Sequence, residues 1–291
     1  MIKIENDFFM LFDTHCHLQF NSFKDDRPDA LTRSLDRGLI LNVVGTQIDT
    51  SRAAVAFAEQ YDNIYATIGL HPIHTAEIDV DEEETSFISR AEVFDYDEYL
   101  KLGRSPKVIG IGECGLELFH LPPELSREEI LTKQIEIFRS QFRLAEELRL
   151  PLVLHVSEAH PEMIDLLKSY NRPIRGVVHC FTGDWTNAQE YLKLGLHIGL
   201  GGVITFPPKK LNPETQLGLT EAILKIPLEK IVVETDSPYL APQAYRGKRC
   251  EPWMAEETVK KIAEIKKLGV YEVNEAILKN SLELFNVSIV I

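Results

Sequence analysis

The chain alternates between short apolar runs and segments with helical periodicity, and this alternation repeats along its 291 residues. The apolar runs are rich in β-branched residues and lack polar alternation, which is typical of strands buried on both faces. We predict strands over residues 9–13, 39–44, 64–68, 108–111, 152–155, 176–179, 196–200 and 231–234. Eight strand–helix units within about 250 residues match the size of a (β/α)8 barrel. The sequence therefore predicts an α/β fold, a TIM barrel built on a parallel sheet.

The segments between the runs contain the predicted helices. They cover residues 28–37, 50–61, 127–148, 161–170, 187–194, 215–226, 256–268 and 271–285. Ser126 precedes the longest of these and is a suitable N-cap. No G-x-G-x-x-G string follows a predicted strand, which argues against a doubly wound nucleotide-binding sheet. Because no linker rich in Pro, Ser or Gly divides the chain, we expect residues 1–291 to form a single domain.

Acidic residues are concentrated in one segment. Residues 77–98 contain ten acidic side chains and one basic side chain, so they contribute −9 to a formal net charge of −14. We interpret residues 77–103 as an acidic surface insertion between the third and fourth strands. The charge argues against a broad surface for polyanions, but it does not exclude a local anion site around metal ions.

Cysteines and apolar runs indicate the compartment. The four cysteines are spread along the chain and do not form a disulfide framework, which favours the reducing cytoplasm. No run approaches the ~20 apolar residues of a membrane span. No obligate protein partner is evident. Cys114 and Cys180 each adjoin a candidate ligand, and strand alternation predicts that both face the surrounding helices.

Side chains able to bind a metal or transfer a proton follow the predicted strands. They are His15, His17, His71, Glu113, His155, His179 and Asp236. The C-terminal ends of barrel strands form one face, which carries the chemistry of such folds. Burying several imidazoles and carboxylates there is costly unless a cation compensates them. The set exceeds the ligands of one tetrahedral zinc, so we predict two divalent ions, Zn²⁺, Mg²⁺ or Mn²⁺, sharing a carboxylate.

Several strings resemble the TatD family of metal-dependent deoxyribonucleases, a branch of the amidohydrolase-like barrels. They are FDTHCHL, IGLHP, IGECGLE, PLVLHVSEAH, GVVHCFTG, GGVITF and ETDSPYLAPQAYRGKRCEP, in that order from residue 12 to residue 252. The last string is the most specific, because a barrel has no structural need for it.

The resemblance implies a role for each metal-type residue. His15 and His17 would bind one ion together with Asp236, and His155 and His179 would bind the second ion. Glu113 would bridge the two ions as part of the catalytic pair. Asp236, its other member, would also orient or deprotonate the attacking water.

The implied substrate is DNA, single-stranded or at its ends, cleaved as a 3′–5′ exonuclease would cleave it. His71, Arg246 and Lys248 would contact substrate phosphates. Two other functions stay open at this point. One is hydrolysis of an ester such as an aminoacyl-tRNA, and the other is an inactive scaffold stabilised by metal.

The chain departs from the family pattern at several positions. Glu117 replaces the usual Asp, and Cys250 replaces an Asn. Ser157 and Glu158 fill a stretch that usually reads SREA, so an Arg is missing there. None of these is an implied ligand, so they affect substrate binding more than hydrolysis. Glu234 lies two residues before Asp236 and is either a partner of a ligand or a buried structural carboxylate.

Overall fold

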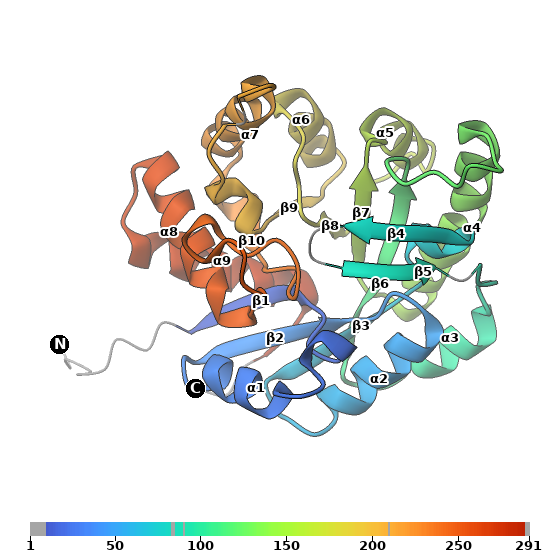
Figure 1. The fold of residues 1–291 in the computed structure, drawn as a ribbon, viewed down its shortest axis with the longest axis horizontal. Helices are drawn as coiled ribbons and strands as arrows, with labels where there is room; N and C mark the ends of the chain where they lie inside the picture. Colours follow the sequence, from blue (N-terminus) through green and yellow to red (C-terminus); the bar gives the residue numbers. More distant parts are fainter. Residues whose placement is uncertain (1–9, 83–84, 90, 209, 289–291) are drawn as a thin grey trace.

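The barrel predicted from the sequence is confirmed by the computed structural model, which describes residues 10–82, 85–89, 91–208 and 210–288. Within these ranges, eight strands form one parallel sheet in the order β1-β2-β3-β6-β7-β8-β9-β10. The strands are β1 (Leu11–Cys16), β2 (Leu39–Val44), β3 (Ile64–Ile68), β6 (Val108–Glu117), β7 (Leu152–Ser157), β8 (Gly176–Val178), β9 (His197–Leu200) and β10 (Ile231–Val233). The sheet curls into a nearly closed barrel with helices outside it (Figure 1).

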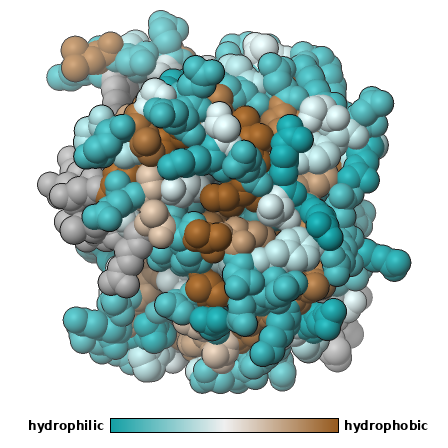
Figure 2. All heavy atoms as spheres, turned by 90° about the vertical axis from the view of Figure 1, so that its right-hand side faces the viewer, coloured by the Kyte–Doolittle hydropathy of each residue, from teal (hydrophilic) through white to brown (hydrophobic). Residues whose placement is uncertain are grey.

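Helices follow the strands and cover the outside of the barrel. They are α1 (Arg27–Leu35), α2 (Ile48–Ala58), α3 (Tyr96–Leu102), α4 (Arg127–Leu148), α5 (His160–Lys168), α6 (Trp185–Lys193), α7 (Pro213–Lys225), α8 (Ala255–Lys266) and α9 (Val270–Phe285). Ser126 caps α4 as expected, because its hydroxyl accepts from the Glu129 backbone N–H. In the described part of the chain, no helix is long and apolar enough to cross a membrane. On the side of the molecule that carries α3 and α4, hydrophilic residues surround a group of hydrophobic ones near the middle of the face (Figure 2).

The inside of the barrel is packed rather than open. Its apolar layer is formed by Phe12, Ile40, Ile109, Val153, Val177 and Val232. Leu284 and Phe285 at the end of α9 close this layer from one end of the barrel. A polar layer lies next to it, in which the Asn42 amide donates to the Thr14 carbonyl at 2.9 Å. The polar layer of the barrel interior therefore packs directly on the apolar layer.

The segment expected to form an acidic surface insertion lies between β3 and β6, the third and fourth strands of the barrel. It contains a hairpin, β4 (Ile78–Glu82) paired antiparallel with β5 (Thr85–Ser89), and then α3, which was not predicted. Tyr99 of α3 is fully buried, and its hydroxyl donates to the Gly69 carbonyl at 3.1 Å. Asp95 caps the helix, and Asp97 and Glu98 lie in its first turn. Acidic residues of this segment therefore stabilise a helix N-terminus, and the interpretation of 77–103 as an acidic insertion stays a prediction.

Candidate metal centre

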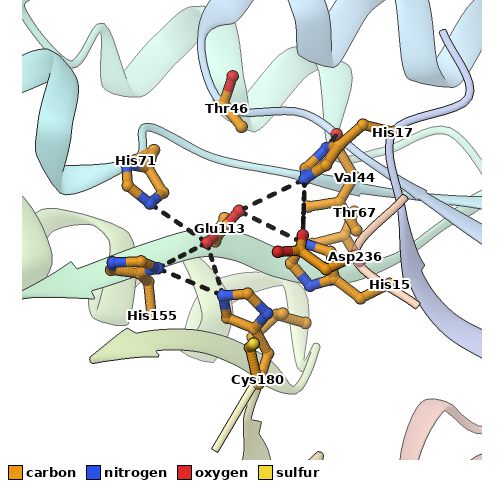
Figure 3. Close-up of polar contacts among 12 residues, drawn as sticks. His15, His17, Val44, Thr46, Thr67, His71, Glu113, His155, Cys180 and Asp236 are labelled. Atoms are coloured by element: carbon orange, nitrogen blue, oxygen red, sulfur yellow. Dashed lines mark hydrogen bonds and ion pairs between the residues drawn. The ribbon is translucent and has the colours of Figure 1, made fainter. Parts of the chain in front are cut away.

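The metal-type residues predicted from the sequence lie together at the C-terminal end of the barrel (Figure 3). The group comprises His15, His17, His71, Glu113, His155, His179 and Asp236. Glu113 lies at its middle, with contacts to imidazoles on both sides. Strand geometry explains the assembly, because parallel barrel strands bring their C-terminal ends to one face.

Glu113 is aimed into the barrel by an irregularity in β6. This strand runs on to Glu117, beyond the predicted end at residue 111, and its register shifts between Ile111 and Cys114. Gly112 has a φ of +156°, and a Cβ there would lie 2.4 Å from the Val153 carbonyl oxygen. The bulge leaves Glu113 only 4% exposed, while Cys114 packs in the outer core as predicted. A glycine is required at 112 for this backbone path.

The two oxygens of Glu113 face different histidines. Oε1 lies 2.9 Å from His155 Nδ1 and 2.7 Å from His179 Nε2. Oε2 lies 3.3 Å from His15 Nε2 and 3.8 Å from His17 Nε2. One carboxylate therefore joins two groups of ring nitrogens that come from opposite sides of the barrel.

The first half of the centre consists of His15, His17 and Asp236. The Nε2 atoms of the two histidines are 3.3 Å apart, and Asp236 Oδ1 lies 3.6 Å and 3.3 Å from them, respectively. His17 Nδ1 donates to the Val44 carbonyl at 2.7 Å, because a carbonyl oxygen can only accept. The tautomer of His17 is thereby fixed, and its Nε2 presents a lone pair to the centre.

The second half of the centre consists of His155 and His179, each backed by a buried carboxylate. His155 Nε2 donates to Glu117 Oε2 at 3.1 Å, and His179 Nδ1 lies 3.3 Å from Glu234 Oε1. Glu234 also accepts from the backbone N–H of Cys180. The sequence left two interpretations of Glu234 open, a partner of a metal ligand or a buried structural carboxylate. In the structure it lies beside His179, a predicted ligand.

The role of Glu117 was missed. Its Oε1 accepts from the backbone N–H groups of Phe119 and His120 at 2.6 Å and 3.0 Å, while Oε2 accepts from His155. From the sequence it was noted only as a departure from the family pattern. The signal was available, because positions 113 and 117 lie on the same face of one extended strand.

His71 lies at the edge of the group as a hydrogen-bond donor. Its Nδ1 accepts from the Ile73 backbone N–H at 3.1 Å, so the ring proton is on Nε2. Nε2 lies 3.2 Å from Glu113 Oε1. This tautomer presents a proton, rather than a lone pair, to whatever lies next to Glu113.

Charges within the group shift the pKa values strongly. Burial opposes the ionised form of Glu113, but the imidazoles of His179, His71 and His15 hold its pKa well below the usual range. Burial also opposes the charged form of His155, yet hydrogen bonds with Glu113 and Glu117 raise its pKa to about 9. At neutral pH this ring carries a proton on both nitrogens, a positive charge that a bound cation can replace.

The donor set suits divalent cations. Among the described residues, groups with the geometry for a metal ion are His15–His17–Asp236, His71–Glu113–His155 and His15–His179–Glu234. Imidazole and carboxylate donors without thiolate fit Zn²⁺, Mn²⁺ or Mg²⁺. In the third group, Glu234 lies on the Nδ1 side of His179, away from Glu113.

Cys180 contradicts one expectation. It is partly exposed at the end of β8 and lies beside the centre, instead of packing against the helices (Figure 3). Its φ of 43° is outside the extended region, so strand alternation no longer sets the direction of its side chain.

The basic residues expected to contact substrate lie in the loop between β10 and α8, which begins after Val233 and contains Asp236. Arg246 and Lys248 are exposed there, and the Arg246 guanidinium lies over the Phe206 ring at 4.6 Å. Arg249, a third basic residue of this loop, forms ion pairs with Asp26 at 2.6 Å and with Glu251 at 3.3 Å. The loop is thus tied to the start of α1, with Arg246 and Lys248 at the same end of the barrel as the centre.

Several known proteins are similar to this chain in sequence and in fold. A family model described as "TatD related DNase" matches residues 12–286. An uncharacterized metal-dependent hydrolase of Bacillus subtilis, YabD, is 33% identical over 96% of this chain and all of its own length. The 3′-5′ ssDNA/RNA exonuclease TatD of Citrobacter koseri is 33% identical over 80% of this chain and 81% of its own. The crystal structure of the Escherichia coli TatD homologue YjjV superposes with a TM-score of 0.80 at 28% identity, covering 97% of this chain and 100% of its own.

Proposed function

Since the chain belongs to the TatD-related DNase family and is a metal-dependent hydrolase, we propose that it is a 3′–5′ exonuclease. Its substrate would be single-stranded DNA, whose phosphodiester bonds it would hydrolyse with two divalent cations. The Citrobacter relative supports the reaction, because its name describes a 3′-5′ exonuclease acting on single-stranded DNA and RNA.

One observation carries the two-cation proposal. The buried carboxylate of Glu113 directs Oε1 to His155 and His179 and Oε2 to His15 and His17. A single ion bound to one of these carboxylate oxygens would have only the histidine nitrogens on that side as further ligands. A bridging carboxylate between two cations satisfies both oxygens at once.

The proposed ligands follow from the two halves. The first cation would be held by His15, His17, Asp236 and Glu113 Oε2, and the second by His155, His179 and Glu113 Oε1. When bound, the two ions would stabilise negative charge on the attacking and leaving oxygens of a displacement at phosphorus.

The chain's own groups would supply the proton chemistry. Although burial opposes its charge, the pKa of Asp236 lies below its usual value because of His17, His15 and His179. An ionised carboxylate at this place orients the attacking water and accepts its proton. His71 Nε2–H would donate to a substrate phosphate oxygen, since its tautomer is set by Ile73.

The loop after β10 supports a nucleic-acid substrate. Arg246 and Lys248 are exposed at the end of the barrel that holds the centre. Guanidinium and ammonium groups next to a hydrolytic centre bind the phosphates that flank the cleaved bond. Because the formal net charge of the chain is −14, we expect this local contact, and not overall attraction, to position the strand.

The test is digestion of single-stranded DNA labelled at its 5′ end, with Mg²⁺ or Mn²⁺ supplied. The wild type should produce a ladder that shortens from the 3′ end, and a 3′ label should appear at once as mononucleotide. Glu113→Gln removes the charge at the bridging position with little change of shape. Its rate should fall by more than about 100-fold, the upper end of the loss expected for a mere partner of a ligand.

Glu136→Gln, at an exposed position on α4, is the matched control and should keep the wild-type rate. Equal products from wild type and Glu113→Gln would refute the proposal. Hydrolysis of an aminoacyl-tRNA without cleavage of DNA would assign the ester hydrolase instead. Absence of both reactions in protein that binds metal would indicate an inactive scaffold.

A further inference from the structure

The first half of the centre is assembled across the seam where the barrel closes. His15 and His17 belong to the end of β1 and the loop after it, and Asp236 follows β10, which ends at Val233. Asp236 has a φ of 60°, in the left-handed region that residues with a side chain rarely adopt. Contacts from elsewhere must therefore hold this backbone in place.

Backbone hydrogen bonds supply part of that support. The Asp236 N–H donates to the His15 carbonyl at 2.9 Å, and the His17 N–H donates to the Ser237 carbonyl at 2.7 Å. These bonds align the two loops with each other. A further backbone bond, from the Tyr239 N–H to the Asp236 carbonyl at 2.9 Å, lies within the Asp236 turn itself.

The carboxylate of Asp13 connects both loops. Its Oδ1 accepts from the backbone N–H of Thr235 at 3.0 Å and from the backbone N–H of His15 at 3.3 Å. Its Oδ2 accepts from the Thr235 hydroxyl at 2.7 Å. Asp13 is fully buried and Thr235 is 2% exposed, so water does not compete for these bonds.

The Thr235 hydroxyl continues the connection past Asp236. While donating to Asp13, it accepts from the backbone N–H of Ser237 at 3.1 Å. The Thr235 hydroxyl oxygen thereby joins Thr235 and Ser237, the residues on both sides of Asp236. Rotation of the Asp236–Ser237 peptide group would break this bond.

We propose that Asp13 and Thr235 form a positioning pair that holds the Asp236 carboxylate at the distance from His15 and His17 that binding of the first cation needs. Neither residue touches the cation or the substrate. The pair acts through the backbone of the two loops, and the proposal rests on the ligands assigned under the proposed function.

The test measures the two dissociation constants for Mn²⁺ or Zn²⁺ by competition with a chromogenic chelator. Thr235→Val removes the hydroxyl at nearly constant shape. One constant should rise by about 10- to 100-fold, as for other partners of metal ligands, and the second should stay within about threefold. The weakened site should be the one lost in His17→Asn, not the one lost in His155→Asn. Thr235→Ser keeps the hydroxyl and should restore wild-type binding.

Thr258→Val is the matched control, because Thr258 is a fully buried threonine on α8 whose hydroxyl has no partner among the described residues. It should leave both constants unchanged. If Thr235→Val does not fold, Asp13→Asn takes its place, since it turns the acceptor for the Thr235 hydroxyl into a donor. Unchanged constants, equal weakening of both sites, or failure of Thr235→Ser to restore binding would overturn the pair. A wild type that binds no cation would overturn the assigned ligands as well.

Discussion

In the first half of the centre, His17 is oriented by a neutral backbone carbonyl, that of Val44, whereas His155 and His179 in the second half face the carboxylates of Glu117 and Glu234. The pKa values follow this difference only in part, because although burial opposes the charge of His17, the Asp236 carboxylate raises its pKa. Burial and the neighbouring His179 lower the pKa of His15, but the two carboxylates beside His155 raise its pKa to about 9. A carboxylate behind a ligand also increases its basicity toward a metal.

This contrast shows two ways of building a ligand set in one barrel. The second half uses charge, and its histidines come from neighbouring strands, β7 and β8. The first half uses backbone geometry across the seam, where β1 and β10 meet through the Asp13–Thr235 contacts. We therefore expect the second half to bind its cation more tightly and the first half to depend more on loop conformation.

Removal of the cations should have the largest effect on stability. Each ion present at 100 times its dissociation constant should add about 2.7 kcal/mol to the free energy of unfolding, because it binds the folded state alone. Titration with a chelator should remove two ions in separate steps, with the first-half ion leaving before the second. Unfolding monitored at each step measures the free energy of unfolding, and metal analysis measures how many ions remain bound. Simultaneous loss of both ions would contradict the difference between the halves.

Glu234→Gln should act on the second half alone. It removes the charge beside His179 while keeping the size of a buried side chain, so the affinity for the second ion should fall by about 10- to 100-fold. Glu117→Gln should weaken the same ion, because it acts through His155. The chelator competition used for Thr235→Val measures both variants. If either variant weakens the first ion as much as the second, charge is not what distinguishes the halves.

The smallest effect concerns His160, a partly buried histidine outside the centre that is hydrogen-bonded to a hydroxyl. Burial lowers the pKa of His160 to about 4, and its Nδ1 lies 2.9 Å from the Tyr191 hydroxyl. Since this pKa is below the ordinary value of about 6.5, its stabilising contribution is complete above pH 6.5 and is lost as the pH falls toward 4. Between pH 7 and pH 6 the loss should be roughly 0.7 kcal/mol.

Urea unfolding of wild type and His160→Gln at both pH values, with a chelator present, gives this difference. The variant keeps a side chain that can hydrogen-bond to Tyr191 but does not titrate, so its stability should change less with pH. An equal pH dependence in the two proteins would show that burial of His160 has no such cost.

The barrel and the family were both predictable from the sequence. The resemblance carried by strings such as IGECGLE and ETDSP is confirmed by the match over residues 12–286. The barrel was predictable because its strands are apolar on both faces and alternate with helices. Local patterns failed where the backbone leaves the regular strand. The strand predicted to end at residue 111 continues through a bulge to Glu117, and the left-handed turn at Cys180 redirects that side chain.

The sequence by itself determined which donors would meet, because a parallel barrel directs the C-terminal end of every strand to one face. Only the tertiary structure decided which oxygen of Glu113 faces which histidines, and that the carboxylates of Glu117 and Glu234 lie beside the histidines of the second half. It also decided that Asp13 would reach Thr235, a residue 222 positions away in the chain. These contacts depend on strand register and on closure of the barrel, and no local pattern of residues encodes the distance between chain segments so far apart.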